Sequence, residues 1–233
     1  MKLSVIVPVF NEEQTIGEVI ERVFAADIGD IEKEIIVAND GSSDRTPTAI
    51  DGSRFRSDPR LRVFEHSINL GKGAAIRLGL RHATGDVMLI QDADLELHPR
   101  EYSALLAPIL AGEADVVYGS RFLQGQRNIS LRTRLANRGL TFVANVLFKA
   151  RLTDMETGFK VFRREALSGI ALRCVGFDFE PEVTAKLLLG GRRIREVPIA
   201  YQPRRKDEGK KIRWIDGLDA LYVLMRCRIN GGK

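Results

Sequence analysis

The stretch Asp86-Val-Met-Leu-Ile-Gln-Asp-Ala-Asp94 decides the fold of this 233-residue chain. It predicts a strand over 86–90, because four consecutive apolar residues are typical of a strand buried on both faces of a parallel sheet. Two aspartates, Asp92 and Asp94, follow the strand at once. Ligands of open α/β sheets bind outside the carboxyl ends of the strands. The two carboxylates therefore stand where such a fold places its site.

The residues before this stretch alternate between strand and helix patterns. Apolar and β-branched runs predict strands at 3–9, 34–38 and 61–64, and apolar residues at helical spacing predict helices at 15–26 and 72–82. Parallel neighbours need a crossover helix between them. The sequence thus predicts an α/β fold, with a Rossmann-like, doubly wound and mostly parallel sheet flanked by helices.

The pattern after residue 94 is less regular. It predicts a strand at 115–118, a helix at 131–149, a turn and strand within 153–164, a helix at 180–189, an edge strand at 193–199 and a last helix at 214–229. No repeat, low-complexity tract or linker divides the chain. We therefore expect one domain over residues 1–233.

Basic residues give the chain a formal charge of +5 and gather in two segments, 121–138 and 192–213. Such patches attract nucleic acid, anionic lipid or phosphorylated substrates alike. The patches lack interleaved aromatic residues and no nucleic-acid-binding motif is present, so no nucleic-acid partner is expected. No apolar leader precedes the first strand, and no apolar stretch reaches the ~20 residues that cross a bilayer. These features predict a cytoplasmic protein.

The pair Asp92 and Asp94 has two readings. Aspartates are common at helix caps and turns, where such a pair would be structural. Carboxylates are also the ligands that Mg²⁺ and Mn²⁺ take beside substrate phosphates. The position after a buried strand favours the metal site.

Several motifs occur together in a fixed order. They are Pro8-Val-Phe-Asn-Glu12, Asn39-Asp-Gly-Ser-Ser-Asp44, Asn69-Leu-Gly-Lys-Gly73, Gln91-Asp-Ala-Asp-Leu-Glu96, Gly119-Ser-Arg121 and Asp154-Met-Glu-Thr-Gly-Phe-Lys160. With this set the chain resembles the family 2 glycosyltransferases of GT-A fold, and more narrowly the polyprenyl-phosphate and dolichyl-phosphate hexose synthases. The resemblance implies a nucleotide-sugar-binding half, 1–118, and an acceptor-binding half, 119–233, that includes the last helix.

The resemblance also implies roles for individual residues. Donor contacts would come from Pro8, Phe10, Glu12, Asn39, Asp40, Lys72, Asp92, Ala93 and Asp94. A divalent metal would be held by Asp92 and Asp94, with Glu96 as a third ligand directly or through water. Gly71 and Gly73 would let backbone approach the donor closely, and Lys72 would reach a phosphate.

The implied reaction is metal-dependent transfer of a hexose from UDP- or GDP-sugar to a lipid phosphate, with inversion at the anomeric carbon. A phosphate oxygen is already anionic, so cations that position it matter more than a base. The predicted catalytic residues are Asp94, Asp154, Arg121 and Arg204, and the predicted acceptor-binding residues are Arg132, Arg134 and Lys210.

Two other functions fit the same residues. A hydroxyl acceptor would need a base such as Asp154, or Glu156 beside it. A non-catalytic protein that binds nucleotide sugars would use the same donor residues. A lipid acceptor implies peripheral contact with the cytosolic face of a membrane through the basic loop 203–211 and the last helix, whose apolar face would serve equally well in core packing or a homodimer.

Overall fold

The structure is a computed structural model that describes residues 1–123, 129–203 and 214–231. Its strands are β1 (Lys2–Val9), β2 (Glu32–Asn39), β3 (Leu61–Glu65), β4 (Val87–Ile90), β5 (Val116–Ser120), β6 (Lys160–Arg163) and β7 (Ile194–Pro198). Its helices are α1 (Ile16–Ala25), α2 (Thr46–Asp51), α3 (Lys72–His82), α4 (Tyr102–Leu110), α5 (Leu131–Phe148), α6 (Arg164–Leu167), α7 (Phe179–Leu189) and α8 (Trp214–Ile229), with a 3₁₀ turn at Pro99–Glu101.

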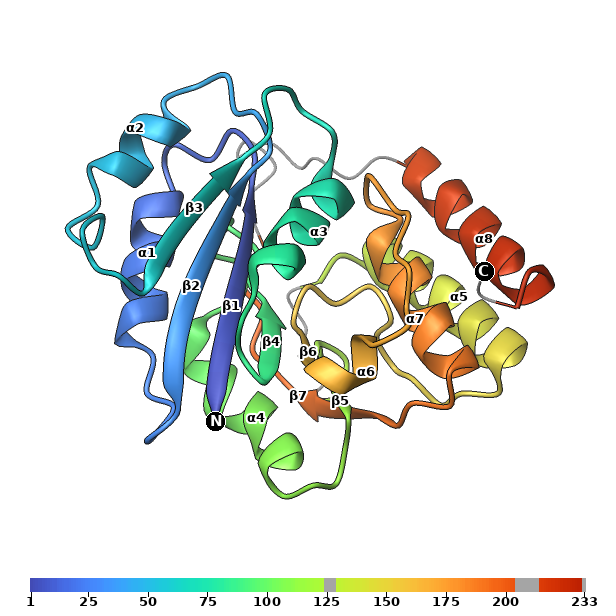
Figure 1. Cartoon of the computed structure of the whole chain (residues 1–233). Helices are drawn as coiled ribbons and strands as arrows, with labels where there is room; N and C mark the ends of the chain where they lie inside the picture. The colour runs from blue at the N-terminus through green and yellow to red at the C-terminus, as the bar shows by residue number, and fades with distance from the viewer. Residues whose placement is uncertain (124–128, 204–213, 232–233) are drawn as a thin grey trace.

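The strands form one sheet in the order β3-β2-β1-β4-β6-β5-β7 (Figure 1). The predicted mostly parallel α/β sheet is confirmed, because β6 alone among the paired strands runs antiparallel to its neighbours, β4 and β5. The strand predicted at 193–199 does lie at an edge. The strands β1, β2 and β4 are parallel neighbours, so their carboxyl ends lie side by side along the same side of the sheet.

Alternating side chains of the strands divide the core between the two faces of the sheet. Leu3, Val5 and Val7 of β1 pack with α1, α2 and α4 on one face. Ile6 of β1 points the other way and packs with α3, α6 and α7. The sheet is therefore covered by helices on both sides, which explains its near-continuous apolar strands.

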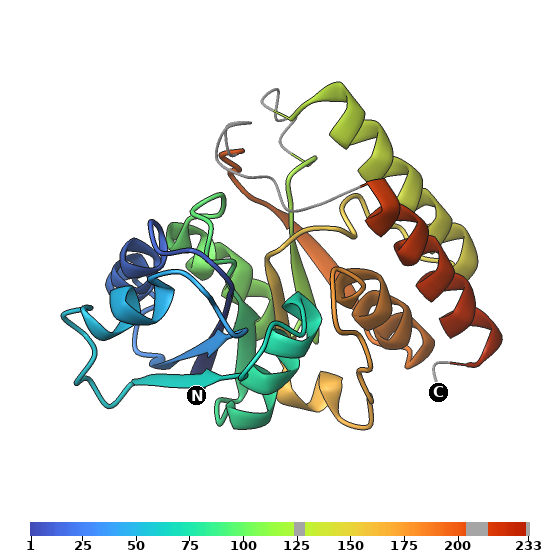
Figure 2. The same cartoon turned by 90° about the horizontal axis from the view of Figure 1, so that it is seen from above.

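Two helices add a further layer. The inner faces of α5 and α8 pack on α7 around Ala144, Ala185, Val223 and Leu224. Figure 2 shows α7 between the sheet and these two helices. None of the described helices is both long enough and apolar enough to span a membrane.

The helix α4 was not predicted from the sequence. Its residues, Tyr102–Leu110, are mostly apolar around the whole helix and include Pro108, so they show no amphipathic period. Tertiary packing accounts for the helix, because Tyr102, Leu105, Leu106 and Ile109 are buried against the sheet.

Candidate active site

The loop after β4 presents the two predicted metal ligands and is held firmly. Gln91, which is fully buried, donates to the carbonyls of Asp92 at 2.9 Å and Leu97 at 3.1 Å. Tyr102 of α4 donates in turn to Gln91 Oε1 at 2.7 Å. Helix α4, which was not predicted from the sequence, therefore helps to fix the loop through Tyr102 and Gln91.

The remaining loop residues are fixed by local bonds. Asp94 Oδ1 accepts a hydrogen bond from the Glu96 N–H at 3.1 Å. Thr15 Oγ1 donates to the carbonyl of Ala93 at 2.7 Å, and the Ala93 side chain is buried. The backbone between Asp92 and Asp94 is thus tied to the start of α1.

Asp92 is bound to a cation of the chain itself. Lys72 Nζ lies 2.8 Å from Asp92 Oδ1 and 2.9 Å from Glu180 Oε1 of α7. Burial alone would lower the pKa of Lys72, but the two carboxylates outweigh it and raise the pKa, so the ammonium stays charged. Lys72 thus pairs with two carboxylates of the chain, and its contact with a donor phosphate stays a prediction.

The glycines around Lys72 serve packing within the chain. Gly71 has φ of 108°, and a side chain there would collide with the Val175 carbonyl. The N–H groups of Gly73 and Ala74 each donate at 3.0 Å, to the carbonyls of Gly176 and Val175. Gly71 and Gly73 thus allow a close approach of the chain's own backbone, and their approach to a donor stays a prediction.

The third predicted metal ligand turns toward the acceptor half. Glu96 Oε2 accepts a hydrogen bond from the Tyr201 hydroxyl at 2.9 Å. Among residues 1–123, 129–203 and 214–231, no three acidic, histidine or cysteine side chains come close enough to hold one metal ion. The structure therefore does not assemble Asp92, Asp94 and Glu96 into a ready three-carboxylate site.

Two carboxylates in one loop still fit a magnesium-type cation. Such ions prefer oxygen ligands, keep several waters and are often bound by one or two carboxylates together with substrate phosphates. The Lys72 ammonium beside Asp92 shows that this carboxylate already faces a cation. That Asp92 and Asp94 hold a metal ion stays a prediction. The oxygen atoms of the two carboxylates are ligands of the kind that such an ion prefers.

Arg121 and Asp154, both predicted to act on substrate, are paired with each other. The Arg121 guanidinium donates to both Asp154 oxygens, at 2.7 and 2.8 Å, and its backbone N–H adds a bond of 3.0 Å. Asp154 is fully buried and Arg121 is 9% exposed. Bidentate pairs of this kind are strong and well oriented, so Asp154 orients Arg121.

Tyr201 links this pair to the loop after β4. The Arg121 guanidinium lies 5.3 Å from the centre of the Tyr201 ring, whose hydroxyl bonds Glu96. Burial, with the nearby Glu96 charge, raises the pKa of Tyr201, so the hydroxyl remains a donor. The Arg121–Asp154 pair and the loop after β4 therefore belong to one site.

Two further charged residues, Lys160 and Glu156, lie in the 154–160 segment. Lys160 is fully buried and donates to the carbonyls of Met155 at 2.8 Å and Thr157 at 2.6 Å. Burial, together with the Glu180 charge, raises the pKa of Glu156 to about 7. Glu156 Oε1 is buried and has no hydrogen-bond partner among the described residues.

The predicted donor residues line the carboxyl ends of β1 and β2. Pro8 and Asn39 are buried, and Phe10 and Glu12 are half-buried. Asp40 is 1% exposed and accepts bonds from the Leu70 N–H at 3.1 Å and the Gly71 N–H at 2.6 Å. It thus shapes the loop that leads into α3.

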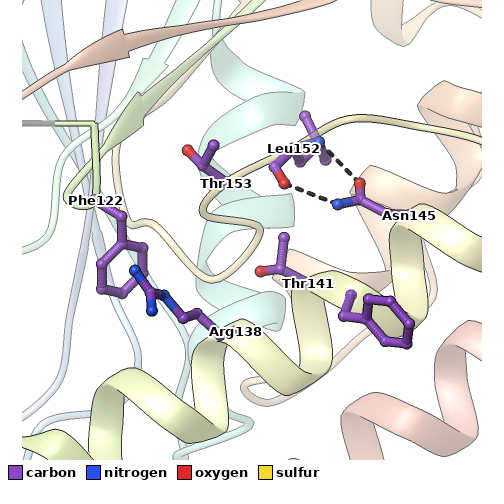
Figure 3. Close-up of a pocket in the computed structure, with 7 residues that line it drawn as sticks. Phe122, Arg138, Thr141, Asn145, Leu152 and Thr153 are labelled. Carbon is purple, nitrogen blue, oxygen red and sulfur yellow. Dashed lines mark hydrogen bonds between the residues drawn. The ribbon is translucent and has the colours of Figure 1, made fainter.

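The predicted acceptor residues are placed only in part. Arg132 is exposed and Arg134 half-buried in the first turn of α5, while Arg204 and Lys210 lie outside the described residues. A pocket of about 260 Å³ opens beside the same helix (Figure 3). Its lining includes Phe122, Arg138 and Leu152.

Sequence reasoning missed two carboxylates of the site. Glu180 in α7 binds Lys72, and Glu196 in β7 accepts bonds from the N–H groups of Thr153, at 2.7 Å, and Asp154, at 2.8 Å. Glu180 begins the predicted helix 180–189, and Glu196 lies in the predicted edge strand 193–199, where other charged residues stand beside both acids. The sequence pattern therefore gave no signal that singled them out.

The model of the family described as glycosyl transferase family 2 matches residues 4–170, which is most of the chain. The chain belongs to glycosyl transferase family 2. It is a glycosyltransferase, and its sheet is the GT-A fold shared with solved relatives. The predicted family and fold are thus confirmed.

Curated family 2 relatives are similar over nearly the whole chain. A dolichol-phosphate mannosyltransferase of Pyrococcus furiosus is 31% identical over 90% of this chain, which spans 59% of that relative's length. A polyprenol monophosphomannose synthase of Mycolicibacterium smegmatis is 31% identical over 97% of this chain and 87% of the relative.

Solved structures agree on the fold. The crystal structure of a Mycobacterium tuberculosis glucosyl-3-phosphoglycerate synthase with Mg²⁺ and uridine diphosphate is 25% identical, with a TM-score of 0.68, over 99% of this chain and 77% of that one. Another structure of that synthase has a TM-score of 0.72 at 22% identity, over 99% of this chain and 80% of the other.

Proposed function

We propose that this glycosyltransferase moves a hexose from a nucleotide sugar to a polyprenyl phosphate, with inversion at the anomeric carbon. The observation that carries the proposal is that Asp92 and Asp94 follow β4 and the oriented cation Arg121 follows β5 on the same side of the sheet, with Tyr201 between Arg121 and Glu96. The names of the Pyrococcus and Mycolicibacterium relatives support a lipid-phosphate acceptor. The Mg²⁺ and uridine diphosphate in the relative's structure support a nucleotide donor and a divalent metal.

In this proposal each part of the site has a separate task. Asp92 and Asp94 would hold Mg²⁺ or Mn²⁺, which would offset negative charge on the departing diphosphate. Arg121, held by Asp154, would grip a phosphate in a fixed direction. The acceptor oxygen is already anionic, so no residue needs to remove a proton from it.

The pocket beside α5 suits the lipid end of such an acceptor. Phe122, Phe142 and Leu152 give it apolar walls, while Arg138 adds a guanidinium. An isoprenoid chain joined to a phosphate needs this combination. Phe122 follows Arg121 directly in the chain, so the pocket begins next to the proposed phosphate-binding group.

The outer faces of α5 and α8 support contact with a membrane. Large apolar side chains at least 46% exposed form one stripe on each helix: Leu131, Leu135, Phe142 and Val146 on α5, and Leu218, Tyr222, Met225 and Ile229 on α8. Both stripes lie opposite the faces packed on α7. Arginines accompany them on both helices, as in helices that lie on anionic lipid.

One observation favours a second candidate, a hydroxyl acceptor. A hydroxyl must lose a proton, and Glu156 offers a buried carboxylate oxygen without a hydrogen-bond partner in the described part of the chain. Its raised pKa, about 7, would suit a general base. Asp154 is less suited, since Arg121 occupies both of its oxygens.

The test uses radiolabelled UDP- and GDP-hexoses with Mn²⁺, with and without undecaprenyl phosphate. We expect label in the butanol phase only when the lipid is present, and loss of that label in Asp94→Ala. Glu32→Ala removes a carboxylate that is 70% exposed at the opposite end of β2 and should transfer normally. Label that enters only a water-soluble product would overturn the lipid acceptor, and full turnover of Asp94→Ala would overturn the metal assignment.

A further inference from the structure

Lys72 makes an unusual bridge within the site. Its ammonium lies 2.8 Å from Asp92 and 2.9 Å from Glu180, and the side chains of Lys72, Asp92 and Glu180 are 18%, 20% and 7% exposed. One positive charge thus serves two partly buried carboxylates, of which Asp92 is a proposed metal ligand. Little water is available there to weaken the attraction.

The other side of Asp92 is closed by backbone. A side chain at Gly158 would meet Asp92 Oδ2, so the 154–160 segment passes close to this carboxylate, which would have to shift to make room for a larger residue. The carboxylate is held between this backbone and the Lys72 ammonium. Contacts within the chain therefore orient Asp92.

The same contact weakens the site for a free divalent cation. A metal ion that bound Asp92 would meet the Lys72 charge across the shared carboxylate, and like charges repel strongly in a partly buried site. Within the described ranges no third acidic, histidine or cysteine ligand completes the site. The protein alone thus offers a metal the carboxylates of Asp92 and Asp94, and Asp92 already faces an ammonium.

A diphosphate would change this balance. It brings several negative charges and its own oxygen ligands, and it can accept hydrogen bonds from an ammonium. Both the metal and Lys72 would then have anionic partners.

We propose that Lys72 is a built-in counter-cation, which keeps Asp92 in position without a metal and makes divalent-cation binding depend on the donor's diphosphate. The inference rests on the proposed metal-dependent donor binding. It assigns Lys72 a positioning role that acts through Asp92. The competing explanation is an ion pair that only fastens α3 to α7.

The experiment measures Mn²⁺ binding by calorimetry for the wild type and Lys72→Met, each alone and with UDP or GDP. We expect wild-type protein to bind Mn²⁺ at least tenfold more tightly with one of the nucleotides. Lys72→Met should bind Mn²⁺ alone about tenfold more tightly than the wild type does. The nucleotide should then increase the Mn²⁺ affinity of Lys72→Met by a smaller factor than in the wild type. Arg81→Met, which removes the same charge from the exposed last turn of α3, should leave all values unchanged.

A second variant protects the test from misfolding. Lys72→Met leaves Glu180 buried without its partner, whereas Lys72→Met with Glu180→Gln removes both charges and should retain the wild-type circular dichroism. The role of Lys72 would be overturned if the double variant bound Mn²⁺ alone no more tightly than the wild type does, while the nucleotide still strengthened Mn²⁺ binding by the wild type. That result would leave the proposed function standing. Failure of the wild type to bind Mn²⁺ with either nucleotide would overturn the metal assignment itself.

Discussion

At the scale of single residues, the site depends on buried charges that are paired within the chain. Arg121 and Asp154 are both at most 9% exposed and share two side-chain bonds. Removing one member of a buried pair leaves the other charge uncompensated, which costs far more than breaking an exposed pair.

Asp154→Asn should therefore lower the free energy of unfolding by about 3 kcal/mol. Urea unfolding followed by circular dichroism would measure it. The control is Glu113→Gln, which removes the carboxylate that pairs with Arg195 where both side chains are at least half exposed. That variant should lose less than ~1 kcal/mol, and equal losses in the two variants would contradict the reasoning.

Gly158 allows a second prediction at this scale. Gly158→Ala should push the Asp92 carboxylate away from its place, because the added Cβ would meet Asp92 Oδ2. Misplacing a reacting group by about 1 Å can cost roughly 100-fold in rate, so we expect a loss of transfer of that order, measured with the radiolabelled donor. Gly17→Ala, in α1 with nothing within 4 Å of the new Cβ, should keep full activity. Normal transfer by Gly158→Ala would show that the Asp92 position is not critical.

At the scale of elements, Glu34 ties three segments together at the amino end of the sheet. Its carboxylate accepts a hydrogen bond from the Ser4 hydroxyl of β1 at 2.6 Å. It also accepts one at 2.6 Å from the backbone N–H of Thr84, which precedes β4. Burial alone would raise the pKa of Glu34, but these bonds and the pairing with Lys2 lower it from 4.5 to about 2. The folded state therefore binds this proton more weakly than the unfolded chain does.

The sign of the pH dependence follows from that difference. A carboxylate with a lowered folded pKa stabilises the fold above its unfolded pKa, near 4.5, and the contribution is lost as the pH falls toward 2. Glu34→Gln should thus be less stable than the wild type by about 2 kcal/mol at pH 7, with a gap that narrows between pH 4.5 and 2. Urea unfolding at several pH values tests this. Glu32→Gln, whose side chain is 70% exposed in the same strand, should match the wild type throughout.

Elements also show what the sequence can and cannot predict. The bounds of α3 and α8 follow from helical spacing and match the structure, because one face of each helix is buried. The antiparallel insertion of β6 between β4 and β5 could not be predicted, since pairing is set by contacts between distant segments. The placement of Asp40 and Asp92 at the carboxyl ends of neighbouring parallel strands was predictable from the strand pattern, but the partners of Lys72 and Arg121 were not.

At the scale of the whole molecule, the two stripes on α5 and α8 bring eight exposed, large apolar side chains onto two neighbouring helices. Each helix already buries its inner face, so the outer residues are not needed for folding. Large exposed apolar surfaces usually mark an interaction site. The proposed lipid acceptor gives this surface a partner, because the acceptor must be reached in a bilayer.

The stripes therefore predict binding to lipid vesicles. Leu135 on α5 and Tyr222 on α8 are 61% and 65% exposed, and each would lose apolar contact with the bilayer if changed to serine. Leu135→Ser with Tyr222→Ser should reduce cosedimentation with phosphatidylglycerol vesicles roughly tenfold or more. Leu110→Ser, at a 54% exposed site on α4 across the sheet, should bind as the wild type does. The membrane prediction would be contradicted if the wild type did not bind vesicles. If light scattering then showed a dimeric wild type and a monomeric double variant, the stripes would join two copies of the chain.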